Sequence, residues 1–196
     1  EAAAVGDATL LGADLTWKNL AEALRTRRHW RAVHLGQSGL IADGRSRAAY
    51  LEVTPTQDED GALGAFEVAR LGGSADLAVL SAASLSVAPD ELRGVTLDRP
   101  QAFLFAGARR VLFSTMPLDD EATQALMIRF YELWQAEGGP GPLAALRQAP
   151  AYGRSVDLEQ VDPVASQRQQ RRVTRKVRPW EHPYYWAAWT LWGLPD

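Results

Sequence analysis

The run Leu77–Ala83, which reads Leu-Ala-Val-Leu-Ser-Ala-Ala, constrains the fold most strongly, because it is continuous, apolar and preceded by Gly72-Gly73. A strand without polar alternation has to be covered on both faces, which is typical of parallel sheets flanked by helices. Shorter β-rich runs alternate with helical patterns along the rest of the chain. The sequence therefore predicts an α/β fold with a largely parallel sheet.

The remaining elements follow from apolar periodicity and from capping residues. Strands are predicted over 8–11, 32–35, 48–53, 77–83, 110–114 and 186–192. Helices are predicted after Thr16, over 100–107, from Asp119 or Asp120 to a stop before Gly138, and over 142–148. In the first helix, apolar residues recur with the spacing i, i+3, i+4, i+7, and Thr16 is a typical N-cap.

The length of 196 residues predicts one domain over 1–196. Residues 150–182 hold few large apolar side chains and several prolines, which indicates an insertion or excursion before the last strand. Because the chain begins with Glu1 rather than methionine, we expect it to be a piece of a longer protein.

Composition excludes several functions. The chain has no cysteine, which excludes disulfides, cysteine-ligated zinc, iron–sulfur clusters and thiol catalysis. The three histidines, His29, His34 and His182, have no metal-ligand spacing, and the turn 36–39 lacks a phosphate-binding pattern, so we expect neither metal nor cofactor. A net charge of −3 disfavours a general nucleic-acid coat. With no apolar run of about 18 residues, we expect no membrane span. The absence of cysteine fits a cytoplasmic protein, which is the location that we expect.

Five stretches of the chain carry a family resemblance in their order and spacing. They are 33–39 (Val-His-Leu-Gly-Gln-Ser-Gly), 77–83, 102–111 (Ala-Phe-Leu-Phe-Ala-Gly-Ala-Arg-Arg-Val), 114–123 (Ser-Thr-Met-Pro-Leu-Asp-Asp-Glu-Ala-Thr) and 182–188 (His-Pro-Tyr-Tyr-Trp-Ala-Ala). Together they resemble the CHAT domain, a caspase-like peptidase domain often attached to tetratricopeptide repeats. The resemblance implies a caspase-like, doubly wound, mostly parallel sheet of about six strands with helices on both faces. It also implies tetratricopeptide repeats in the full-length chain as a possible partner.

The resemblance further implies where a catalytic pair should stand. The family pattern His-x-x-x-His-Gly, whose second histidine is catalytic, aligns with 34–39 and places Ser38 at the catalytic position. The family pattern Leu-Ser-Ala-Cys aligns with 80–83 and places Ala83 at the nucleophile. Alanine has no nucleophilic atom, and a serine hydroxyl is no general base near neutral pH. Losing a member of such a unit costs on the order of 10⁴-fold in rate, so the inherited mechanism is unavailable to this chain.

The leading hypothesis is therefore a catalytically inactive pseudo-peptidase that serves as a protein-binding, peptide-binding or regulatory module. One alternative is a cysteine endopeptidase of the family whose nucleophile was replaced by engineering. Another is a moved nucleophile, because Ser38, Ser81 and Ser84 all lie near the inherited site and His34 could pair with a serine. Against that pairing, His34 matches the non-catalytic histidine of the family, whose ring would be satisfied locally at the end of a buried strand.

Two further groups of residues are candidates for binding. Asp119 and Asp120 could select a basic side chain of a peptide, with Ser81 and Ser84 completing the pocket, or they could cap a helix. The second group is the basic run 167–178, which contains Arg168, Arg171, Arg172, Arg175, Lys176 and Arg178 and no acidic residue. If it is helical, four of its arginines share a face that could dock an acidic partner or, less favoured, nucleic acid. The simpler interpretation is a solvated excursion.

Overall fold

The computed structural model describes residues 8–36, 51–81, 100–114, 116, 118–161, 168 and 174–194. It divides into two compact units, Glu1–Asp120 with Ala188–Asp196, and Glu121–Ala187. The elements of the first unit are η1 (Gly12–Asp14), α2 (Trp17–Arg25), β1 (Trp30–Leu35), β2 (Leu51–Glu52), β3 (Ala62–Leu63), α3 (Ala65–Arg70), β4 (Ala75–Leu80), a helix over 100–106, β5 (Arg110–Ser114) and β8 (Trp189–Gly193).

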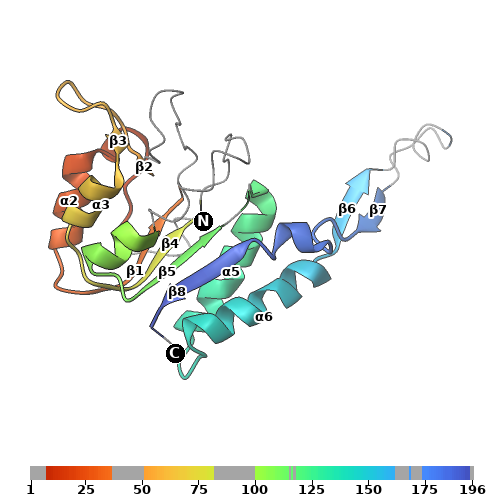
Figure 1. The fold of residues 1–196 in the computed structure, drawn as a ribbon. Helices are drawn as coiled ribbons and strands as arrows, with labels where there is room; N and C mark the ends of the chain where they lie inside the picture. Colours follow the sequence, from red (N-terminus) through yellow and green to blue (C-terminus); the bar gives the residue numbers. More distant parts are fainter. Residues whose placement is uncertain are drawn as a thin grey trace. The chain divides into compact units, whose positions relative to one another are not determined.

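The main sheet has the strand order β1-β4-β5-β8 (Figure 1). Strands β1, β4 and β5 run parallel, and β8 pairs antiparallel with β5. The prediction of a mostly parallel α/β sheet is confirmed, and the arrangement agrees with the caspase-like fold that the resemblance implies.

Strand β4 is buried on both faces, as its apolar run predicts. Leu77 and Val79 are 0% exposed on one face, and Ala78 is buried on the other. Successive side chains of a strand point to opposite faces, so both sides of the sheet are covered at this strand. The face with Ala78 belongs to a core cluster that also holds Val68 of α3 and Phe103 of the helix over 100–106. Burying an apolar side chain of this kind stabilises the fold by about 1.5–3 kcal/mol.

Helix α2 begins where the sequence predicts. Thr16 is its N-cap, and the Thr16 Oγ1 accepts a hydrogen bond of 3.2 Å from the backbone N–H of Asn19. Leu20 and Ala21 are buried on the apolar face. An N-cap of this kind contributes about 1 kcal/mol, so local capping and periodicity are sufficient to place this helix.

The last strand, β8, is held closely against β5. Phe113 and Trp192 meet edge to face with ring centroids 5.4 Å apart. At the end of β8, Gly193 has φ +121°, and a Cβ there would lie 2.3 Å from the carbonyl oxygen of Arg109. Only glycine therefore permits this backbone approach. The next residue, Leu194, donates its backbone N–H to the same carbonyl at 3.1 Å.

Three strand predictions are wrong in position or in partner. Residues 8–11 form no strand, because the chain turns at Gly12 into η1 and leaves Leu11 exposed. Of 48–53 the structure describes 51–53, where Leu51–Glu52 pairs antiparallel with β3 in a separate two-stranded sheet. The last strand begins at Trp189 rather than 186, since the chain before it forms the 3-10 helix η2 (Pro183–Tyr185) and then a turn over 186–188. The described residues thus give the main sheet four strands, not six.

The second unit contains two helices and a hairpin. Its elements are α5 (Asp120–Gln135), α6 (Pro142–Ser155), β6 (Leu158–Val161), β7 (Thr174–Val177) and η2 (Pro183–Tyr185). The helix predicted from Asp119 or Asp120 is confirmed as α5, on which Phe130, Tyr131 and Trp134 are buried and contact one another.

Helix α6 is longer than the predicted segment 142–148 and continues past Pro150. A proline inside a helix costs about 3 kcal/mol. The small residues Ala145, Ala149 and Gly153 follow one another at i, i+4, i+8 and are all buried, as is Pro150 itself. Burial of this face offsets the free-energy cost of the proline. The local sequence pattern does not reveal that burial.

Candidate functional site

The carboxyl ends of the three parallel strands meet at one edge of the sheet. Leu35 of β1 is level with Leu80 of β4, and Leu80 is level with Phe113 of β5. Open α/β sheets place ligands beyond the carboxyl ends of their parallel strands. This edge is therefore the candidate functional site. Ser38 and Ala83 follow β1 and β4 in the sequence but, like Ser84, lie outside the described residues, so their adjacency stays a prediction.

A side-chain hydrogen bond joins the ends of β1 and β4 at this edge. The Nε2 of His34 lies 2.7 Å from the Oγ of Ser81, and Ser81 is buried. The backbone N–H of Ser81 also donates to the carbonyl of Leu35 at 3.1 Å. His34 is level with Val79, two residues before Ser81, so the two side chains lie on the same face. This pair ties together the strands from which segments 36–50 and 82–99 depart.

Sequence reasoning considered a pair between His34 and one of three serines, Ser81 among them, and disfavoured it on the expectation that the ring is satisfied locally. The partner instead lies 47 positions along the chain. The signal available was that each stands at the end of a predicted parallel strand, where side chains two residues apart share a face. A hydroxyl at this distance can donate its proton to the imidazole nitrogen, which is the contact that a serine nucleophile uses. With 4% of its surface exposed, Ser81 presents little of itself to a substrate.

Ser81→Ala is expected to lower the free energy of unfolding by about 1–3 kcal/mol, because the half-buried Nε2 of His34 loses this hydrogen bond. Ser74→Ala is the matched control, because the Ser74 Oγ makes a similar 2.8 Å contact with the Nδ1 of His29 at an exposed position. Water can replace that partner, so the change there is expected to stay within about 0.5 kcal/mol. Urea denaturation measures both, and equal losses would contradict a structural role for the buried pair.

Strand β5 ends in a polar turn at the same edge. The Oγ of Ser114 donates to the carbonyl of Met116 at 2.6 Å and accepts from its backbone N–H at 3.2 Å. Ser114 is buried, and it pairs in register with Trp189 of β8. The hydroxyl fixes the direction in which the chain leaves β5, and no sequence motif pointed to it.

Asp119 and Asp120 are both exposed, and Asp120 is the first residue of α5. Negative charge at the N-terminus of a helix is stabilised by the helix dipole. A cap was expected of Asp119 or Asp120, and Asp119 is the residue that immediately precedes α5. Selection of a basic peptide side chain by these two carboxylates stays a prediction.

The basic run does not form the helical face considered above. Arg175 lies in β7, which pairs with β6 in an antiparallel hairpin, and Arg171 and Arg172 lie outside the described residues. Because residues 174–177 pair with 158–161 as a strand, Arg175 cannot take the helical position assumed for it. The hairpin base is joined by Arg178, whose Nε donates to Asp157 at 2.9 Å. That guanidinium lowers the pKa of the Asp157 carboxyl below its ordinary value.

Over the described ranges, no group of three or more histidine and carboxylate side chains could hold a metal ion. In the same part of the chain, no helix has the length and apolar character needed to cross a membrane.

The fold and the site define an open α/β domain with polar side chains at the carboxyl edge of a mostly parallel sheet. Residues 2–194 match the family model of the CHAT domain. The chain therefore belongs to the CHAT domain family, a caspase-like peptidase family, as the five sequence stretches predicted. No curated protein matches the chain.

Proposed function

We propose that this CHAT domain is a pseudo-peptidase, which binds a peptide or protein segment at the carboxyl edge of its sheet and does not cleave it. The observation that carries the proposal is the residue type at the two positions aligned with the family's catalytic pair, Ser38 and Ala83. Peptide cleavage by this family needs a thiolate to attack the carbonyl and an imidazole to protonate the leaving amine. Neither group stands at its position.

Loss of the reactive pair does not remove the scaffold around it. Strands β1 and β4 are parallel neighbours, so the segments that follow them leave from adjacent points. The bond between His34 and Ser81 holds those points together. An edge that is ordered in this way supports binding, because less conformational entropy is lost when a ligand is held.

The acidic pair at the start of α5 provides a basis for specificity. Carboxylates bind arginine through two parallel, charge-assisted hydrogen bonds, which are stronger than neutral ones. Asp119 and Asp120 are exposed and close in sequence to the end of β5. A peptide with an arginine or lysine side chain is therefore the proposed ligand, and a protein segment or the repeats expected in the full-length chain are the proposed natural source.

Fluorescein-labelled peptides with one arginine or lysine in an Ala-Gly background are expected to bind the natural protein and to remain intact. Asp119→Asn/Asp120→Asn is expected to weaken binding about tenfold, because two charged contacts become neutral. The matched control, Asp58→Asn/Glu59→Gln, removes the same charge from an exposed turn and should have little effect. Anisotropy measures binding and mass spectrometry measures cleavage. Cleavage by the natural protein would overturn the proposal.

A serine hydrolase built on Ser81 and His34 is a second candidate, favoured by their 2.7 Å contact. A fluorophosphonate probe, which labels activated serines, separates the two candidates. The pseudo-peptidase proposal expects no label at Ser81. Labelling that Ser81→Ala and His34→Asn both abolish would favour the hydrolase instead.

A further inference from the structure

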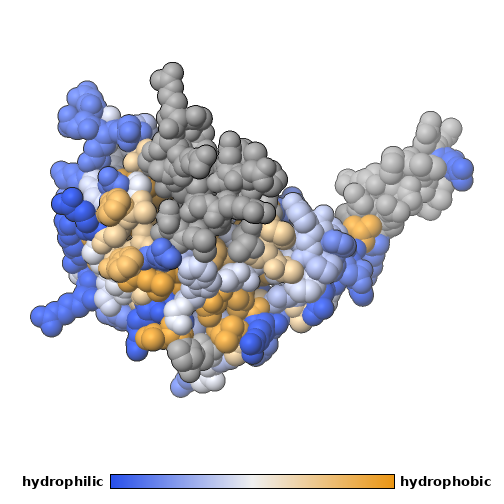
Figure 2. Space-filling view, in the orientation of Figure 1, coloured by the Kyte–Doolittle hydropathy of each residue, from blue (hydrophilic) through white to orange (hydrophobic). Residues whose placement is uncertain are grey.

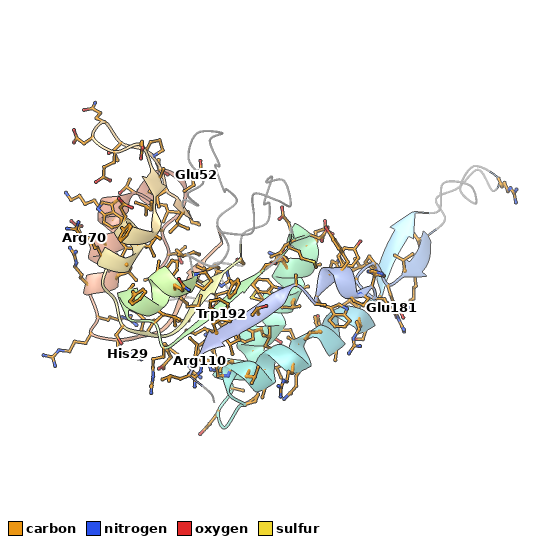
Figure 3. All side chains as sticks on the ribbon, viewed as in Figure 1. His29, Glu52, Arg70, Arg110, Glu181 and Trp192 are labelled. Carbon is orange, nitrogen blue, oxygen red and sulfur yellow. The ribbon has the colours of Figure 1, made fainter. Side chains whose placement is uncertain are left out.

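A second surface lies at the amino ends of the strands, at the edge of the sheet opposite the proposed peptide site. Four arginines occupy seven consecutive positions between the end of α2 and the start of β1, and Arg109 stands just before β5. All five are exposed: Arg25, Arg27, Arg28, Arg31 and Arg109, here called the N-edge basic surface. Figure 3 shows His29 and Arg110 at this end of the sheet, with Arg70 of α3 away from them.

The turn that carries these arginines is held in place at several points. The indole Nε1 of Trp30 donates to the carbonyl of Leu24 at 3.0 Å, and the Trp30 backbone N–H donates to Ser74 at 2.8 Å. The guanidinium of Arg27 lies 4.5 Å from the centroid of the Trp30 ring, a cation–π contact. A segment fixed in this way loses less conformational entropy when a ligand binds, because it is already partly ordered in the free protein.

The carboxylate of Asp76 stands within this surface. The Oδ1 of Asp76 lies 3.1 Å from the Nε2 of His29 and 3.4 Å from the Nη1 of Arg109. The Nδ1 of His29 in turn contacts the Oγ of Ser74 at 2.8 Å. Arg25 and Arg28, both exposed, add a local excess of positive charge beside this group. That excess contrasts with the chain's net charge of −3, and hydrophilic side chains gather over α2 and the turn that follows it (Figure 2).

We propose that the N-edge basic surface binds an acidic segment of a partner protein. The five side chains that define the surface are all arginine, whose planar fork matches carboxylates with two hydrogen bonds. A short acidic segment would contact the arginines alone. A long nucleic acid would also approach the acidic remainder of the chain, which repels it. Arg27 already lies over the Trp30 ring, where a base would otherwise stack.

The test uses the full chain and a fluorescein-labelled deca-glutamate peptide, followed by anisotropy at low and physiological salt. Binding is expected to weaken as salt rises, because exposed charges are screened. Arg25→Glu/Arg28→Glu is expected to weaken binding about tenfold or more, since two attractive contacts become repulsive. Asp76→Asn is expected to strengthen it about threefold, because the competing internal carboxylate loses its charge. A merely structural role for Asp76 would not produce this gain.

The matched control is Lys18→Glu/Arg70→Glu, which makes the same charge change at exposed positions of the same unit. It should leave binding almost unchanged. The assignment would be overturned if the control weakened peptide binding equally. It would also be overturned if Arg168→Glu/Lys176→Glu abolished peptide binding while Arg25→Glu/Arg28→Glu did not. Tighter binding of a twenty-nucleotide oligo-dT would favour nucleic acid instead. If the chain self-associates and Arg25→Glu/Arg28→Glu abolishes that self-association, the surface binds the acidic turn 58–60 of a second copy. That outcome would contradict binding of a different partner protein.

Discussion

The double variant Ser38→His/Ala83→Cys is expected to carry a thiol that is alkylated about tenfold faster at pH 7 than the thiol of Ala83→Cys alone. A free thiol with a pKa near 8.5 is only a few per cent thiolate at that pH, and a neighbouring imidazolium lowers its pKa. Most of the thiol then ionises, although the lower basicity of the thiolate reduces part of the gain. Iodoacetamide rates, measured against pH, report the effect directly.

The control for this result is Ser38→Ala/Ala83→Cys, which alters the same two positions without adding an imidazole. Its thiol should react like that of Ala83→Cys. Identical rates and pH profiles in all three variants would show that positions 38 and 83 are not side by side, and the alignment with the family's catalytic pair would then be wrong. Cleavage of peptides by the double variant alone would show that the binding edge still orients a substrate.

Phe113→Ala is expected to lower the free energy of unfolding by about 3–5 kcal/mol. The ring is buried in the core and contacts Trp192 edge to face, so its removal leaves a cavity on that face of the sheet. For a chain of this length the melting temperature should fall by roughly 2–4 °C for each kcal/mol. Calorimetry or urea denaturation measures the loss.

Phe105→Ala provides the matched control, because Phe105 is 82% exposed. The same substitution there leaves no cavity, and its effect is expected to stay within about 0.5 kcal/mol. Similar losses at Phe105 and Phe113 would contradict the assignment of Phe113 to the core of the sheet.

The parts of the fold that the sequence predicted are those determined by local pattern. The apolar run over 77–83 needs burial on both faces wherever it lies, and residues 77–80 of it lie in the central strand β4. Thr16 and the periodic residues after it determine α2 in the same local way. Segment 48–53 looked like another strand of the sheet, but its described part pairs with β3. Strand partners depend on distant residues, and α6 continues past Pro150 because its small residues are buried.

The candidate site was predicted from the sequence only in part, for the same reason. Its place at the ends of β1 and β4 followed from parallel strands and from the family resemblance. The contact between His34 and Ser81 did not, because it joins residues 47 positions apart whose register is set by the whole sheet. The N-edge basic surface was also missed, although four of its arginines stand within residues 25–31. Folding adds only Arg109 to them.

The end of β8 has a consequence for tethered ligands. Gly193 and Leu194 lie against Arg109, and the Nε of Arg110 donates to the carbonyl of Leu194 at 2.8 Å. A peptide fused after residue 196 would thus emerge within a few residues of the arginine-rich edge. Short flexible tethers give effective concentrations in the millimolar range. Even a weakly binding acidic tail, attached there, would occupy that edge intramolecularly and compete with any ligand added from solution.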